Sequence, residues 1–234
     1  MEVISDRSIY KFSAGNEPVL QVPSGAPVRI HTKDCFSNQL RRPEDKMEAL
    51  DWDRINPATG PVFVEGAEPG DILKVTIQKI ELDENGTVVS GEELGILGGI
   101  LKDVHTKIIP IRDGKAIFDS RTEIPVRPMI GVIGVAPERE EINTGTPGRH
   151  GGHMDNTMVE EGASLYFNVV VPGALFACGD VHAVMGDGEI GVSGLEIPAV
   201  IDVVLEVVKG KSIEGPMLEN QDCWSAIASA EDLE

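Results

Sequence analysis

The chain has 234 residues, of which 41% are hydrophobic and 25% are charged, and its formal net charge is −19. No apolar run approaches the roughly 18 residues of a membrane-spanning helix, and the negative charge disfavours nucleic acid as a partner, because like charges repel. The three cysteines, Cys35, Cys178 and Cys223, form neither a disulfide framework nor a CxxC metal motif. The first residues lack the basic-then-apolar order of a secretory signal, so we expect a cytoplasmic protein.

Strands and tight turns are predicted for the first half of the chain. Residues 28–32 read as a strand, and Pro43–Leu50 suits a short helix with proline near its first turn. Apolar and polar side chains alternate in residues 72–80, which is typical of a half-buried strand. Asn85-Gly86 and Asp113-Gly114 are both favoured in primed two-residue turns, so each predicts a β-hairpin.

The second half continues the β pattern. Residues 136–157 read as a long loop, and loops of that length inside compact domains are often functional. The glycine-rich residues 92–107 are also predicted to be irregular, and Trp224–Leu233 is predicted to form a helix. Three further apolar stretches predict strands over residues 165–171, 174–184 and 197–207. Short strands with few helices predict a mainly β fold of sandwich or barrel-like sheets.

The densest group of chemically active side chains lies in residues 179–189, from Gly179 to Glu189. Asp180 and His182 are two residues apart, so an extended strand projects both from the same face. Asp187 and Glu189 repeat this spacing, and a turn at the intervening glycines would fold the second pair toward the first. Carboxylates grouped with an imidazole predict a metal site or a general acid/base site.

Five segments, taken together and in order, resemble the acetamidase/formamidase family. No single segment is specific, but their order along nearly the whole chain is. They are Thr32-Lys33-Asp34-Cys35 with Asn38-Gln39, and residues 66–71, 127–137, 147–155 and 179–189. The chain departs from the family at His153, where asparagine is usual. Family chains also usually continue well beyond Leu233, so we expect the C-terminal part of the family to lie outside these residues.

The resemblance implies hydrolysis of the C–N bond of small amides to a carboxylate and ammonia. It implies a mostly β fold with a smaller mixed α/β portion and few short helices, and a homodimer or higher homo-oligomer. We expect residues 1–234 to form one catalytic unit. The alternative prediction divides this unit into two β subdomains, with a boundary near residues 136–157.

We predict that Asp34, Asp180 and His182 bind a divalent cation, zinc or calcium, which would activate the attacking water. Glu189 is predicted to be the general base, because other carboxylates and apolar walls raise the pKa of a carboxyl group. Asp187 is the second catalytic candidate.

Asp155 and His153 end the glycine-rich loop and are predicted to bind the substrate. Glu196 precedes a strand, and it either enters the site or only starts the sheet. His150 is interpreted as structural or solvated.

Two alternatives remain open on the sequence. Cys178 shares the predicted strand face of Asp180 and His182, so an amidase with Cys178 as nucleophile and His182 as base is one alternative. The other is a β module that binds a cation without catalysing a reaction.

Overall fold

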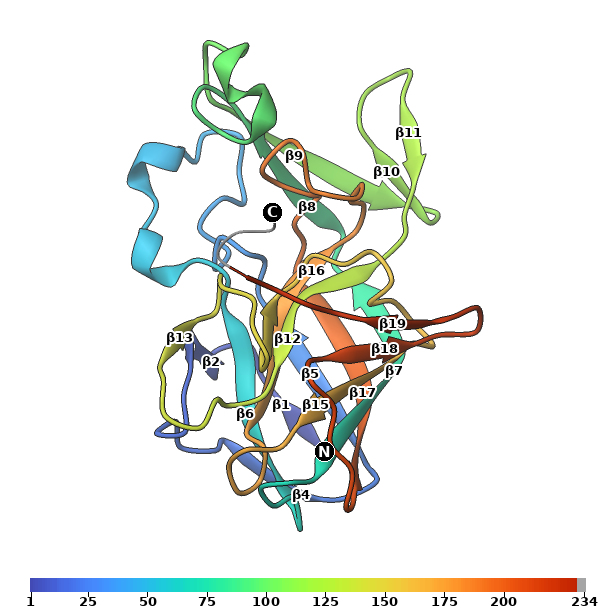
Figure 1. Ribbon diagram of the computed structural model, residues 1–234. Coiled ribbons are helices and arrows are strands. Elements are labelled where there is room, and N and C mark those ends of the chain that lie inside the picture. Colours follow the sequence, from blue (N-terminus) through green and yellow to red (C-terminus); the bar gives the residue numbers. More distant parts are fainter. Residues whose placement is uncertain (231–234) are drawn as a thin grey trace.

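The computed structural model describes residues 1–230, and it confirms the mainly β fold (Figure 1). Among these residues the helices are three short 3-10 segments: η1 (Met47–Ala49), η2 (Trp52–Arg54) and η3 (Ile96–Gly99). In the same part of the chain no helix has the length and apolarity needed to cross a membrane.

A seven-stranded sheet forms one layer. Only its first pair is parallel, and the other neighbours are antiparallel. In spatial order its strands are β1 (Glu2–Val3), β5 (Ala26–Thr32), β17 (Ala199–Val208), β7 (Ile72–Leu82), β15 (Ser164–Asn168), β18 (Met217–Glu219) and β19 (Trp224–Ala226).

A six-stranded sheet forms the second layer. Its path is β14 (Gly151–His153), β12 (Met129–Gly134), β16 (Phe176–His182), β6 (Ala58–Glu65) and β2 (Ser8–Ile9), and β4 (Leu20–Pro23) pairs with β6. A small two-stranded sheet joins β13 (Ile142–Asn143) to β3 (Lys11–Phe12).

A four-stranded sheet lies at the end of the molecule away from the N-terminus (Figure 1). Its strands, in spatial order, are β11 (Glu123–Pro125), β10 (Lys115–Ile117), β9 (His105–Arg112) and β8 (Asn85–Ser90). The antiparallel pair of β8 and β9 forms its longest ladder.

The main hydrophobic core joins the two larger sheets. Alternate residues of β5, β7 and β17 are buried, as their sequence pattern predicts, and they cluster with apolar residues of β6, β12 and β16. Examples are Val28, Ile77 and Ile201 from one sheet and Val62 and Ile130 from the other. This packing makes β16 a fully buried strand with a neighbour on each side.

One predicted hairpin is confirmed and the other is wrong. Asp113 and Gly114 both have positive φ and join β9 to β10 in the expected primed turn. Asn85-Gly86 instead begins β8, which pairs with β9 rather than with β7. Glycine is needed there for a close approach, since a Cβ on Gly86 would lie 2.8 Å from Leu195 Cδ1.

The predicted helices also differ from the structure. Pro43–Leu50 contains only the 3-10 turn η1. Trp224–Ala226 form strand β19, paired with β18, and Trp224 stacks on Tyr166 with ring centroids 5.3 Å apart. The helix predicted for Trp224–Leu233 is therefore wrong at its start, while residues 231–233 lie outside the described part of the chain.

The predicted loop over residues 136–157 carries two short strands, β13 and β14. Strands from both sides of this segment pair within the same sheets, as β12 does with β16. A boundary between two subdomains near this segment stays a prediction.

Candidate active site

Six acidic and imidazole side chains form one cluster, and all of them except Asp155 line a cavity of about 270 Å³. Asp180 and His182 come from the end of β16, and Glu189 and Glu196 come from the segment that follows. His182 Nε2 lies 3.0 Å from Glu196 Oε2, 3.4 Å from Asp180 Oδ1 and 3.9 Å from Glu189 Oε1. His153 and Asp155 complete the group, with His153 Nε2 lying 3.0 Å from Asp180 Oδ2 and 2.6 Å from Asp155 Oδ2.

Backbone pairing brings Glu196 into this cluster. Its N–H donates to the Thr87 carbonyl (2.9 Å), and its carbonyl accepts from the Thr87 N–H (2.7 Å). The same residue forms a β-bridge with His182. The segment before β17 is thus held between β8 and β16, which fixes a fully buried carboxylate against the His182 ring.

Three of the carboxylates are carried on left-handed backbone. The φ angles are 40° at Asp155, 55° at Asp180 and 41° at Glu189. Such conformations are uncommon outside glycine and concentrate at functional sites, where the surrounding structure maintains them. Here Asp180 and Glu189 line the same cavity, and Asp155 contacts the cavity-lining His153.

Gly131 of β12 makes the necessary room. A Cβ at this position would lie 2.5 Å from Asp155 Oδ1 and 2.6 Å from Asp180 Oδ2. No side chain fits at these distances, so glycine is required for the two carboxylates to approach each other.

Burial and crowding shift the pKa values of the cluster in opposite directions. Burial, with repulsion from neighbouring carboxylates, raises the pKa of Glu189 to about 7 and that of Glu196 to about 8. Burial alone would lower the pKa of His153, but Asp155 and Asp180 outweigh it and raise that pKa to about 11. Burial would likewise raise the pKa of Asp180, yet the imidazoles of His182 and His153 hold it well below its usual range.

The donor set suits a divalent cation. Both carboxylate oxygens of Asp180 and Oε2 of Glu196 are buried, with only an imidazole nitrogen at 3.0–3.4 Å, and Oδ1 of Asp155 is buried with no hydrogen-bond partner among the described residues. Buried carboxylates with so few partners are costly, and a bound cation would satisfy them further. Within residues 1–230, three groups of potential ligands have atoms within 4.8 Å of one another: Cys35, Asp180 and Glu196; His153, Asp155 and Asp180; and His182, Glu189 and Glu196.

The family of the chain follows from comparison with known proteins. The model of the acetamidase/formamidase family matches residues 11–145 and 138–227. The chain belongs to the acetamidase/formamidase family.

Solved structures of this family share the fold. A recombinant predicted acetamidase/formamidase from Thermoanaerobacter tengcongensis is 50% identical, with a TM-score of 0.92, over 94% of this chain and 73% of that chain. An acetamidase from Bacillus halodurans is 40% identical with the same TM-score, over 94% of this chain and 75% of its own.

Curated relatives are more distant. An acetamidase from Mycolicibacterium smegmatis is 26% identical over 81% of this chain, and a formamidase from Methylophilus methylotrophus is 23% identical over 82%. The chain spans 63% and 61% of the lengths of these two relatives, respectively.

Asp34 of this family member does not enter any of the three potential ligand groups. Its Oδ1 accepts the Asn38 N–H (2.7 Å), and its Oδ2 lies 3.6 Å from Arg41 Nη1. Burial raises the pKa of Asp34 to about 6, against the opposing effect of Asn38 and Arg41. The carboxylate thus closes the turn that contains Cys35, and its role as a metal ligand stays a prediction.

Asp187 and Cys178 lie outside the cavity lining. The Thr157 hydroxyl donates to Asp187 Oδ1 (2.7 Å) at the surface. Cys178 belongs to the main core, and burial raises the pKa of its thiol to about 12. A protonated thiol with no access to the cavity is a poor nucleophile, so the geometry disfavours the Cys178 alternative.

Cys35 and Glu196 belong to the site, although the sequence alone does not assign them to it. Cys35 lines the cavity beside Asp180 and Glu196, and its thiol pKa is raised well above the usual value by burial and by both carboxylates. Glu196 stands between Leu195 and Ile197, and an acidic residue inside an apolar stretch signals a buried carboxylate.

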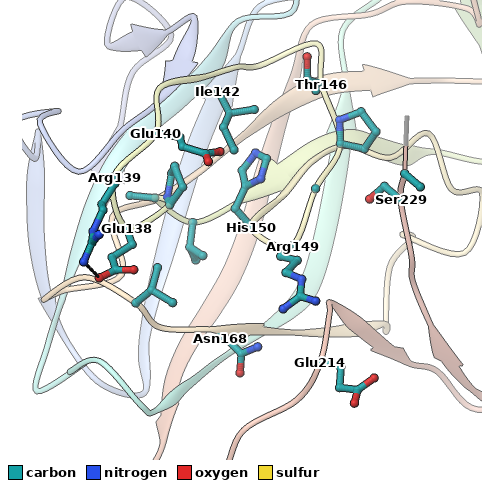
Figure 2. A pocket seen from close by; sticks show the side chains of 17 residues that line it. Glu138, Arg139, Glu140, Ile142, Thr146, Arg149, His150, Asn168, Glu214 and Ser229 are labelled. Atoms are coloured by element: carbon teal, nitrogen blue, oxygen red, sulfur yellow. Dashed lines mark ion pairs between the residues drawn. The ribbon is translucent and has the colours of Figure 1, made fainter. Parts of the chain in front are cut away.

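A larger cavity, of about 730 Å³, lies elsewhere and lacks such convergence. Figure 2 shows Arg139, Glu138 and Arg149 spread around it, with His150 among them. Its only short charge contact joins the sequence neighbours Arg139 and Glu138, among the described residues that line it. The smaller cavity is therefore the candidate active site.

Proposed function

We propose that the protein hydrolyses the C–N bond of short linear amides, such as formamide and acetamide, to a carboxylate and ammonia. Membership of the acetamidase/formamidase family supports this reaction. The observation that carries it is a cluster of four carboxylates and two imidazoles, of which all but Asp155 line one cavity. A cytoplasmic location and a homo-oligomeric state remain predictions from the sequence.

A divalent cation would be held by Asp180, His182 and Glu196, because His182 Nε2 lies 3.4 Å from Asp180 Oδ1 and 3.0 Å from Glu196 Oε2. A mixed imidazole and carboxylate set suits zinc better than calcium, which prefers six to eight oxygen ligands. Such a cation supplies Lewis-acid polarisation of the amide carbonyl and acidifies a bound water.

Glu189 is the proposed general base. It stands at the rim of the cluster, 3.9 Å from His182 Nε2, and its Oε1 accepts the Gly194 N–H (2.7 Å), which fixes the carboxylate. It would take a proton from water as the water oxygen bonds to the amide carbon. The same proton then passes to the amide nitrogen as the C–N bond breaks, which releases ammonia and the carboxylic acid.

His153 and Asp155 are proposed to position the substrate and Asp180. The His153 ring bridges both carboxylates and approaches the Gly145 carbonyl through Nδ1 (3.3 Å). Asp187 remains a weaker catalytic candidate, because its carboxylate is engaged with Thr157 outside the cavity lining.

The decisive experiment measures ammonia release from formamide, acetamide and propionamide by the purified protein, together with its metal content. Full activity in metal-free protein would contradict the cation role. Full activity in a Cys178→Ala variant would eliminate covalent catalysis by that thiol. If no amide yields ammonia while a cation raises the melting temperature, the protein is a cation-binding module instead.

A further inference from the structure

The candidate active site is lined by two chemically distinct sets of residues. One set holds the carboxylates and imidazoles, and most of the other lining residues are apolar. Phe36, Met47, Trp52, Leu94 and Val192 are among these apolar residues, which form the apolar wall. An apolar wall of this extent is larger than the catalytic cluster itself requires.

The apolar wall is anchored by a hydrophobic cluster of its own, separate from the main core. Phe36 and Val89 are buried in this cluster, and Met47 and Leu94 pack against it partly buried. Trp52 is 56% exposed and lines the same cavity, so it lies toward the solvent. The wall is therefore a supported surface, and its side chains come from three distant parts of the chain.

Val192 gives a second, independent sign that this wall is specific. Its φ is 75°, a conformation that a β-branched residue rarely adopts. A hydrogen bond from its N–H to the Glu189 carbonyl (2.9 Å) holds the turn. This turn links the proposed base directly to the apolar wall.

The cavity is also larger than the smallest amides need. A volume of about 270 Å³ corresponds to roughly nine water-sized groups at about 30 Å³ each. Acetamide has four non-hydrogen atoms, and the attacking water adds one. The cavity thus has room for about four more carbon atoms beside the apolar wall.

Charge restricts what can fill this room. None of the described residues that line the cavity is Lys or Arg, whereas Asp180, Glu189 and Glu196 are acidic. An acyl group that carries a carboxylate or a phosphate would be repelled by these acidic side chains. No basic side chain among the described lining residues would offset that repulsion.

We propose that the apolar wall is an acyl subsite, and that the preferred substrates are primary amides of unbranched aliphatic acids with about four to six carbons. This inference rests on the proposed amide hydrolysis and specifies its substrate class. The amide group would lie at the cluster, and the alkyl chain would extend along Leu94 and Met47 toward Trp52.

The test is the kcat/KM series from formamide to hexanamide, measured by ammonia release. Each buried methylene contributes about a fourfold gain, so we expect kcat/KM to rise about fourfold per carbon beyond acetamide. Leu94→Trp and Met47→Trp fill the subsite from two different segments, so the ratio of kcat/KM for hexanamide to kcat/KM for formamide should fall at least tenfold relative to the wild type. Ile100→Trp is the matched control. Ile100 is 76% exposed, directly follows η3, six residues after Leu94, and does not line the cavity.

The outcomes separate the two proposals. Ammonia from formamide and acetamide, with kcat/KM falling for longer amides, overturns the subsite alone. The same holds if Leu94→Trp, Met47→Trp and Ile100→Trp give the same chain-length profile. No ammonia from any amide overturns the proposed function, and the subsite with it.

Discussion

At the scale of single residues, the proposed role of Glu189 as the general base can be tested directly by substitution. Glu189→Gln keeps the shape and the hydrogen bond from the Gly194 N–H but removes the proton acceptor. We expect kcat for acetamide to fall by about 10²- to 10⁴-fold, as is typical for loss of a general base, with little change in melting temperature. Asp187→Asn tests the second candidate and should retain activity within about threefold, because the Asp187 carboxylate accepts from Thr157 and does not line the cavity. Equal losses in both variants would contradict the assignment.

Gly131 offers a second residue-scale test. Gly131→Ala would place a Cβ 2.5 Å from Asp155 Oδ1 and 2.6 Å from Asp180 Oδ2, which is a severe steric overlap, so one carboxylate must move. We expect activity to fall at least 100-fold, since about 1 Å of misplacement costs that much, and stability to fall by about 1–3 kcal/mol. Gly186→Ala is the matched control, because no atom lies near its added Cβ. Full activity of Gly131→Ala would show that the two carboxylates need not adjoin.

The sequence allowed part of this site to be predicted. Asp180 and His182 are adjacent on one strand, so their grouping follows from a two-residue spacing alone. The approach of Glu196 depends on its pairing with Thr87, which lies 109 residues earlier in the chain. Local spacing carries no record of such a bridge.

At the scale of elements, two dipeptides of the same type have different roles. Asp113-Gly114 forms a turn between β9 and β10, whereas Asn85-Gly86 lies in β8, where the missing side chain allows Leu195 to approach. Composition alone cannot distinguish a glycine needed for positive φ from one needed for close packing. Strands β7 and β17 were predictable because burial follows their alternation, while β19 depends on pairing with β18 and stacking on Tyr166.

The different roles of Gly86 and Gly114 predict different effects on stability and activity when each is replaced by alanine. Gly86→Ala would press on Leu195 and on the Glu196 carbonyl, and should reduce both stability and amide hydrolysis. Gly114→Ala strains only a surface turn, so it should lower stability by about 1 kcal/mol and leave activity unchanged. Urea unfolding and ammonia release measure the two effects. Loss of activity in Gly114→Ala would contradict this division of roles.

At the scale of the whole molecule, binding of a cation should be visible as stability. A ligand that binds only the folded state at 100 times its Kd adds about 2.7 kcal/mol. We expect zinc to raise the melting temperature of the wild type and not that of Glu196→Gln, since Glu196 is a proposed ligand. Asp34→Asn decides whether that residue takes part, because a shift like that of the wild type would exclude it. An equal shift in Glu196→Gln would contradict the proposed ligand set.

The pH dependence of folding offers a further whole-molecule prediction, through a residue remote from the reaction. His150 is 5% exposed, its ring nitrogens have no hydrogen-bond partner among the described residues, and it packs edge-on against Phe12 (Figure 2 shows its position). Burial lowers the pKa of His150 to about 4 from its usual 6.5. The unfolded chain therefore binds a proton below pH 6.5 that the folded chain does not accept until about pH 4.

Stability should consequently fall as the pH drops from 6.5 to 4, by up to about 3 kcal/mol from this residue. Carboxylates titrate over part of the same range, so the wild type must be compared with a variant that lacks only this imidazole. His150→Leu removes the titrating ring at similar apolar volume, and its own packing cost shifts the curve without changing the slope. The free energy of unfolding in urea, measured at several pH values, should decline less steeply in the variant. Parallel curves for the two proteins would show that His150 is protonated equally in the folded and unfolded states, so that burial does not control its charge.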